Sequence, residues 1–90
     1  MKLADLDKFV NQKEIHLYNE GLNDDDLDVL YKVIDQSAVL EELDLGYNEL
    51  TLADGNLTNA IAKNTTLKVL FLNDNNISPR GVQHLTDALN

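Results

Sequence analysis

Residues 40–50 read LEELDLGYNEL and residues 67–77 read LKVLFLNDNNI, so both follow the pattern Leu-x-x-Leu-x-Leu-x-x-Asn-x-Leu, with Ile at the last place of the second. A degraded copy lies upstream, where Ile15, Leu17 and Leu22 occupy the matching apolar places. The first strand position advances from residue 15 to 43 to 70, which gives a period of 28 and then 27 residues. A fixed period of this length predicts stacked supersecondary units rather than an ordinary globular core. Such solenoids usually act through a surface and seldom through a catalytic pocket.

Each copy predicts a short strand followed by a helix. Apolar residues alternate at the start of each unit, and alternation with period 2 is typical of a strand. The strands are expected to be parallel, because a helical segment separates each strand from the next. The residues expected to form helical stripes facing the sheet are Leu27, Leu30, Val33 and Ile34, then Ala53, Leu57, Ala60 and Ile61, then Val82, Leu85, Ala88 and Leu89.

The helix starts are signalled by residues whose side chains can accept hydrogen bonds from free backbone amides. Asn23, Thr51 and Ser78 are the expected N-caps, and Pro79 follows at a position where its missing amide costs nothing. Gly55 weakens the expected second helix, so that helix is predicted to start irregularly.

The 90 residues are expected to form one domain. Apolar residues at 3, 6, 9 and 10 share one helical face and predict a helix over residues 2–11. Residues 1–13 are accordingly expected to cap the apolar N-terminal end of the stack. Three repeats would follow, over residues 14–40, 41–67 and 68–90.

Residues 67–89, LKVLFLNDNNISPRGVQHLTDAL, resemble a repeat of the ribonuclease-inhibitor type of leucine-rich repeat, and the link from Ala62 to Leu67 is similar to the one used by that subclass. The resemblance implies an α/β horseshoe segment with a parallel sheet on the concave face and helices on the convex face. It also implies binding through the concave face. Relatives in that family include inhibitors of nucleases, activators of small GTPases, actin-filament capping proteins and sensor receptors, so the resemblance is specific for fold and not for partner.

The family pattern also implies a ladder of asparagine side chains that satisfy backbone groups where the chain turns inward after each strand. Asn48 and Asn75 are the ladder residues. The first repeat departs from the pattern with Glu20. Either Asn19 substitutes from the neighbouring position, or the first turn is irregular and closer to solvent.

Charge and composition narrow the class of partner. Sixteen acidic and seven basic residues give a formal charge of −9, which disfavours nucleic acid and anionic membranes and favours a protein with a basic patch. The absence of Cys excludes disulfides and thiol chemistry. The N-terminal residues hold acidic groups where a signal peptide needs an apolar run, and no apolar stretch approaches the length of about 18 residues that spans a membrane. A soluble, cytoplasmic protein is expected.

The outward strand positions form the predicted binding surface. Their columns across the three repeats are Glu14, Glu42 and Val69; His16, Asp44 and Phe71; Tyr18, Gly46 and Asn73; and Asn19, Tyr47 and Asp74. Aromatic groups among carboxylates suit protein binding, because the rings supply burial and the charges supply orientation. The predicted partner-binding residues are Glu14, His16, Tyr18, Glu42, Asp44, Tyr47, Phe71, Asn73 and Asp74.

No arrangement in the sequence predicts catalysis, a metal or a cofactor. His16 and Asp44 are expected to be cross-strand neighbours, but no nucleophile accompanies them, since Ser37 and Ser78 fall in turns beside helices. The acidic run from Asp24 lacks the Gly and Glu that an EF-hand loop requires. His84 is expected on the exposed side of the last helix.

The sequence therefore predicts a non-catalytic protein-interaction module. Two alternatives stay open, namely a structural N-terminal segment of a longer solenoid without a partner of its own, and, by family analogy, a regulator of a small GTPase. Self-association through the edge strand at the C-terminal end is also predicted, because an uncovered edge invites a further strand.

Overall fold

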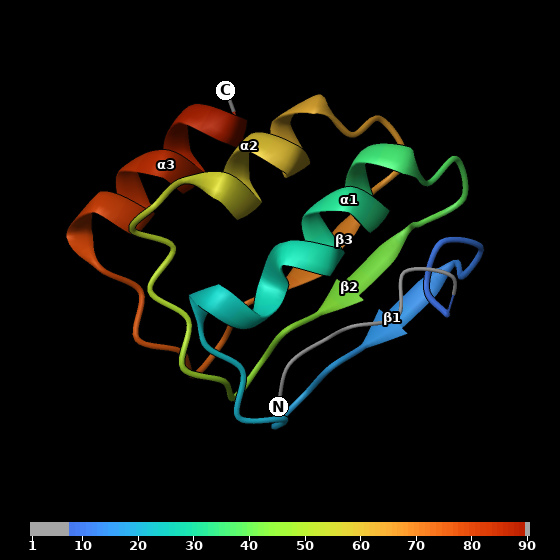
Figure 1. Cartoon of the computed structure of the whole chain (residues 1–90). Coiled ribbons are helices and arrows are strands. Elements are labelled where there is room, and N and C mark those ends of the chain that lie inside the picture. The colour runs from blue at the N-terminus through green and yellow to red at the C-terminus, as the bar shows by residue number, and fades with distance from the viewer. Residues whose placement is uncertain (1–7, 90) are drawn as a thin grey trace.

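Strands lie side by side on one face of the molecule and helices cover the other (Figure 1). The structure is a computed structural model that describes residues 8–89. Each of three successive segments supplies one strand and one helix, in the order β1 (Glu14–His16), a 3-10 helix η1 (Asp24–Leu27), α1 (Asp28–Gln36), β2 (Glu42–Asp44), α2 (Asn56–Lys63), β3 (Val69–Phe71) and α3 (Pro79–Leu89). This architecture confirms the predicted α/β fold, with a parallel sheet and a layer of helices.

The sheet has the order β1-β2-β3, and both strand pairs are parallel. Its register follows the period of the sequence, since Ile15 lies opposite Leu43 and Leu43 lies opposite Leu70. Equivalent positions of successive repeats therefore form straight columns across the sheet.

The core lies between the sheet and the helices and is built mainly from leucine. The side chains of Ile15, Leu43 and Leu45 are completely buried, and each contributes about 1.5–3 kcal/mol through removal from water. Leu70 and Leu72 occupy the equivalent places in the third repeat and are only half-buried. The core of the third repeat is therefore less well covered than that of the first two.

The segment before β1 forms a turn. The amide of Gln12 donates to the carbonyl of Phe9 (3.1 Å), and the Gln12 side chain donates to the carbonyl of Lys8 (2.8 Å). The predicted helix over residues 2–11 therefore does not extend through residues 8–11, where the chain must reverse to enter β1 at Glu14. Residues 1–7 of that predicted helix lie outside the described part. Phe9 is buried against the core.

Two of the three predicted N-caps are found. Asn23 accepts from the amide of Asp26 (3.2 Å), and the Asp26 carboxylate accepts from the amide of Asn23 (2.9 Å), which completes a capping box at η1. Ser78 accepts from the amide of Gly81 (3.0 Å) at the start of α3.

The predicted N-cap at Thr51 is wrong. α2 begins only at Asn56, after Gly55 in the left-handed region (φ 75°), so the irregular start predicted for this helix is confirmed. The reason lies in the neighbouring repeat, because the Thr51 hydroxyl donates to the carboxylate of Asp24 (2.5 Å). Leu52 then adopts a positive φ of 57°, and the first turn of the expected helix is lost.

The orientation of α3 also differs from the prediction. Val82, expected to face the sheet, is 53% exposed. Gly81 takes the inward place instead, where a Cβ would overlap the carbonyl oxygen of Thr51. His84, expected in solvent, is half-buried with its Nε2 3.3 Å from the carbonyl oxygen of Ala53. Among the described residues, no helix combines the length and apolar character needed to cross a membrane.

Candidate functional site on the strand face

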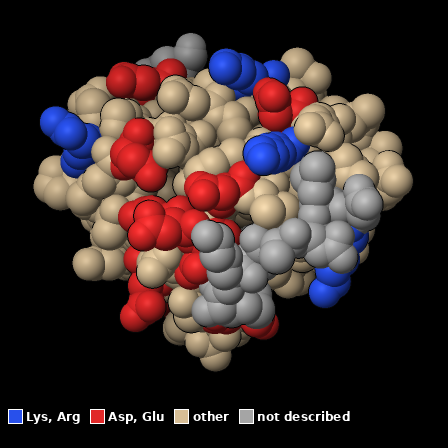
Figure 2. Space-filling model, in the orientation of Figure 1, with Lys and Arg blue, Asp and Glu red and all other residues tan. Residues whose placement is uncertain are grey.

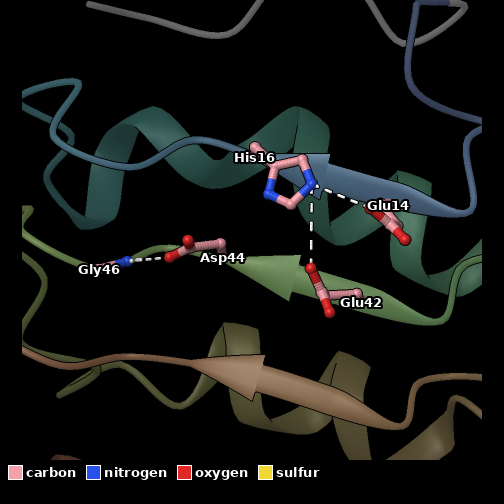
Figure 3. Close-up of polar contacts among 5 residues, drawn as sticks. All are labelled: Glu14, His16, Glu42, Asp44 and Gly46. Atoms are coloured by element: carbon pink, nitrogen blue, oxygen red, sulfur yellow. Dashed lines mark hydrogen bonds and ion pairs between the residues drawn. The ribbon is translucent and has the colours of Figure 1, made fainter.

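The face of the sheet opposite the helices, here called the strand face, carries the predicted partner-binding residues. Side chains alternate along a strand, so burial of Ile15 and Leu43 sends their neighbours outward. Figure 3 shows the side chains of Glu14, His16 and Glu42 in front of the strands, with the helices behind.

Three aromatic rings are exposed on this face. Tyr18 is 50% exposed, Tyr47 46% and Phe71 44%. The rings of Tyr18 and Tyr47 lie with their centroids 5.0 Å apart and their planes inclined at 51°, which is a favourable geometry for an aromatic pair. Phe71 lies opposite Asp44 in the register.

Tyr47 is linked to the third repeat through Asp74. The Tyr47 hydroxyl forms a hydrogen bond with the Asp74 carboxylate. This bond, and then the negative charge of Asp74, raise the pKa of the Tyr47 hydroxyl. Asn73 donates from its side chain to the same carboxylate (3.1 Å). Tyr18, Tyr47, Asn73 and Asp74 therefore form one group at the carboxyl ends of the strands.

A second group lies on β1 and β2 themselves and centres on His16. Its Nε2 lies 3.2 Å from a carboxylate oxygen of Glu14 and 3.8 Å from one of Glu42 (Figure 3). His16 and Asp44 are opposite in the register, as predicted, but their side chains do not pair. The Asp44 carboxylate instead accepts from the amide of Gly46 (2.9 Å), which turns it along its own strand.

Asn48 occupies a ladder position beneath the strand face. Its Oδ1 accepts from the amides of Glu20 and Leu22 (both 3.0 Å). Its Nδ2 donates to the carbonyls of Leu17 (2.9 Å), Leu45 (3.0 Å) and Gly46 (3.1 Å). One buried amide therefore joins the turns of the first two repeats.

Asn75 makes the corresponding contacts one repeat later. Its Oδ1 accepts from the amide of Leu50 (3.0 Å), and its Nδ2 donates to the carbonyls of Leu45 (2.9 Å) and Leu72 (3.1 Å). Each ladder asparagine thus satisfies the turn of the repeat before it. The first turn takes its partner from Asn48, which explains why that repeat tolerates Glu20 in place of asparagine.

Asp24 makes a second link between repeats that the sequence reasoning missed. One carboxylate oxygen accepts from the amides of Thr51 and Leu52 (both 3.1 Å). The carbonyl of Thr51 in turn accepts from the amide of Ser78 (3.0 Å). The equal spacing of 27 residues from 24 to 51 to 78 is the signal in the sequence that could have indicated this link.

Acidic groups also gather away from the strand face. Figure 2 shows Asp and Glu side chains clustered over η1 and the start of α1, located as in Figure 1. Burial, followed by the charges of Asp54 and Asp24, raises the pKa of Tyr31, which donates to the carbonyl of Asp24 (3.3 Å). Within this cluster, Asp24 is the residue that joins the first repeat to the second, through Thr51 and Leu52.

Comparisons with known proteins agree with the fold. A family model described as leucine-rich repeat matches residues 36–55 and 63–85. A curated protein of Caenorhabditis briggsae, named as a protein phosphatase 1 regulatory subunit 37 homolog, is 37% identical over 76 residues, which is 83% of this chain and 8% of that protein. The matched repeats, the parallel sheet and the layer of helices together show that the chain has the leucine-rich repeat fold, as a short solenoid segment.

Proposed function

We propose that this chain is a non-catalytic interaction module that binds a basic segment of another protein on its strand face. The observation that carries the proposal is the Tyr18–Tyr47 ring pair, which is exposed just beyond β1 and β2 and accompanied by Phe71 on β3. Aromatic side chains with little conformational freedom are favoured anchors for binding, because burying them gains area at a small entropy cost.

Charge on the same face supports a basic partner. The outward positions of the three strands hold no Lys or Arg, and the carboxylates at these positions are Glu14, Glu42 and Asp44. Asp74 lies just beyond β3. Complementary charge raises the association rate and excludes acidic competitors more than it raises affinity. Proteins with an exposed Lys- or Arg-rich segment that also presents an apolar anchor are therefore the expected ligands.

The comparisons support the general role. The relative is named as a regulatory subunit, and a regulatory subunit acts by contact with another protein. The 28- and 27-residue periods and one helix for each repeat support assignment to the ribonuclease-inhibitor-like subclass.

Affinity capture with matched variants tests the proposal. Immobilised chain would capture proteins from a lysate, with Tyr47→Ala and Phe71→Ala as test variants and Val82→Ala as control, since Val82 is an equally exposed apolar residue on α3. Captured proteins should be lost from both test variants, be retained by the control and decrease as salt screens the carboxylates. Retention by both test variants, or equal loss from the control, would refute binding on the strand face.

Charge reversal tests the basic character of the partner separately. Glu42→Lys should weaken capture and reduce its dependence on salt, because it replaces an attraction by a repulsion. Glu49→Lys is the matched control, because Glu49 is an exposed carboxylate outside the strands. If the two reversals have equal effects, the partner is not recognised through strand-face charge.

A further inference from the structure

Three potential metal ligands converge on the strand face. The imidazole of His16 and the carboxylates of Glu14 and Glu42 each present one ligand atom, and these three atoms lie within 4.8 Å of one another. The separations from His16 Nε2 are 3.2 Å to Glu14 and 3.8 Å to Glu42 (Figure 3). The arrangement is not apparent along the chain, because Glu42 comes from the next repeat.

The sheet fixes this convergence. Glu14 and His16 stand two residues apart on β1, so both side chains leave the same face. The register places Glu14 directly opposite Glu42. Two like charges facing each other across a strand pair destabilise the pair, and a bound cation would remove that cost. Among residues 8–89, the ion pairs of these two carboxylates are both with His16.

The ligand types select a class of cation. Zinc binds imidazole nitrogen and carboxylate oxygen at about 2.0–2.2 Å, so tetrahedral ligands stand about 3.3–3.5 Å apart. The separations of 3.2 and 3.8 Å bracket that value, and both glutamates can adjust by side-chain rotation, since neither is buried. Calcium and magnesium prefer oxygen ligands throughout, so the imidazole disfavours them.

We propose that Glu14, His16 and Glu42 form a three-ligand site for Zn²⁺, with the fourth coordination position open to solvent on the strand face. The mixed nitrogen and oxygen ligands, held by two hydrogen-bonded strands, carry this assignment. It does not depend on the protein partner proposed above, because the ligands belong to a single chain.

Titration of the untagged 90-residue chain with ZnCl₂ in a calorimeter tests the site directly. We expect one Zn²⁺ for each chain, at least tenfold weaker binding by His16→Gln and by Glu42→Gln, and little heat with CaCl₂. His84→Gln and Glu49→Gln are matched controls that retain the site and should bind as the wild type does. Nuclear magnetic resonance should show the imidazole signals of His16 shifting with added Zn²⁺ while those of His84 stay in place.

Three outcomes would each overturn the proposal. One is the absence of saturable Zn²⁺ binding up to about 1 mM, which would leave the cluster as an ion pair only. Another is unchanged affinity in His16→Gln, which would place the bound metal elsewhere. The third is Ca²⁺ binding as tight as that of Zn²⁺, which would mean that the carboxylates attract any divalent cation. Circular dichroism of each variant establishes that it is folded before it is titrated.

Discussion

Asn48 and Asn75 show how single side chains hold one repeat to the next. Each amide accepts from one turn and donates to carbonyls on both sides of a repeat boundary. Asn48 is buried, whereas Asn75 is half-buried near the edge of the sheet. A backbone amide or carbonyl that loses its hydrogen-bond partner lowers the stability of the folded state more where it is buried, because water cannot replace the partner.

Replacing the ladder residues should therefore lower stability unequally. We expect Asn75→Ala to lower the free energy of unfolding by about 1–3 kcal/mol, and Asn48→Ala to lower it further, because more buried backbone groups lose a partner. Urea unfolding measures both values. Asn76→Ala is the control, since that side chain is exposed. Unchanged midpoints for both ladder variants would show that the amides do not stabilise the turns.

Titration of Tyr31 should lower the free energy of unfolding at high pH. Burial and the nearby charges of Asp54 and Asp24 raise its pKa in the folded chain. The unfolded chain releases this proton near pH 10, so above about that pH the unfolded state binds fewer protons and stability falls as pH rises. In Tyr31→Phe the urea midpoint should fall less steeply between about pH 9 and 11. If the urea midpoints of the variant and the wild type fall equally steeply with pH, this linkage is contradicted.

At the scale of elements, the position of α3 depends on a glycine. Gly81 is buried in the first turn of the helix, and an added Cβ would overlap the carbonyl oxygen of Thr51. Glycine within a helix usually costs about 0.5–1 kcal/mol relative to alanine, but here the close approach of the loop before α2 requires it.

Gly81→Ala should consequently destabilise the protein, against the usual effect of that change in a helix. We expect a loss of about 1–3 kcal/mol, because the backbone at Thr51 must shift and its bonds to Asp24 and Ser78 lengthen. Thermal unfolding compared with Gln83→Ala, an exposed site on the same helix, isolates the close contact. A higher melting temperature for Gly81→Ala would mean that α3 does not approach the loop.

Sequence periodicity predicted each strand and the helical part of each repeat, because those features depend on residues a few places apart. The errors at Thr51 and Val82 have another origin. Thr51 does not cap α2, because its hydroxyl donates to Asp24, 27 residues earlier. The rotation of α3 follows from the close packing of Gly81 against the preceding repeat. The same limit applies to the strand face. The exposure of Phe71 was predictable from alternation, but the pairing of His16 with Glu42 depends on rotamers that the sequence does not specify.

For the molecule as a whole, β3 is the last strand of the described sheet and presents an open edge. Val69 and Phe71 are exposed there, and the half-buried Leu70 lies between them. A cavity of about 300 Å³, lined in part by Ile61 and Leu67, adjoins the same end of the stack. Open parallel edges tend to pair with a further strand.

We therefore expect self-association through β3 as the protein concentration rises. Light scattering from about 10 µM to 1 mM should show a growing average mass, and Phe71→Lys should suppress it by placing a charge on the strand. Val82→Lys, which adds the same charge on α3, should leave the association intact. A constant monomer mass over the whole range would count against edge pairing.

Contacts between strands and between helices run mainly from one repeat to the next, joining β1 to β2, β2 to β3, α1 to α2 and α2 to α3. Structure that forms in one end repeat can therefore reach the other end repeat only through the central one. An end repeat can fray while the other two stay joined. Unfolding of the central repeat leaves two end repeats that no longer contact each other, and neither can bury an apolar core alone. The central repeat therefore decides whether the chain unfolds in steps or all at once.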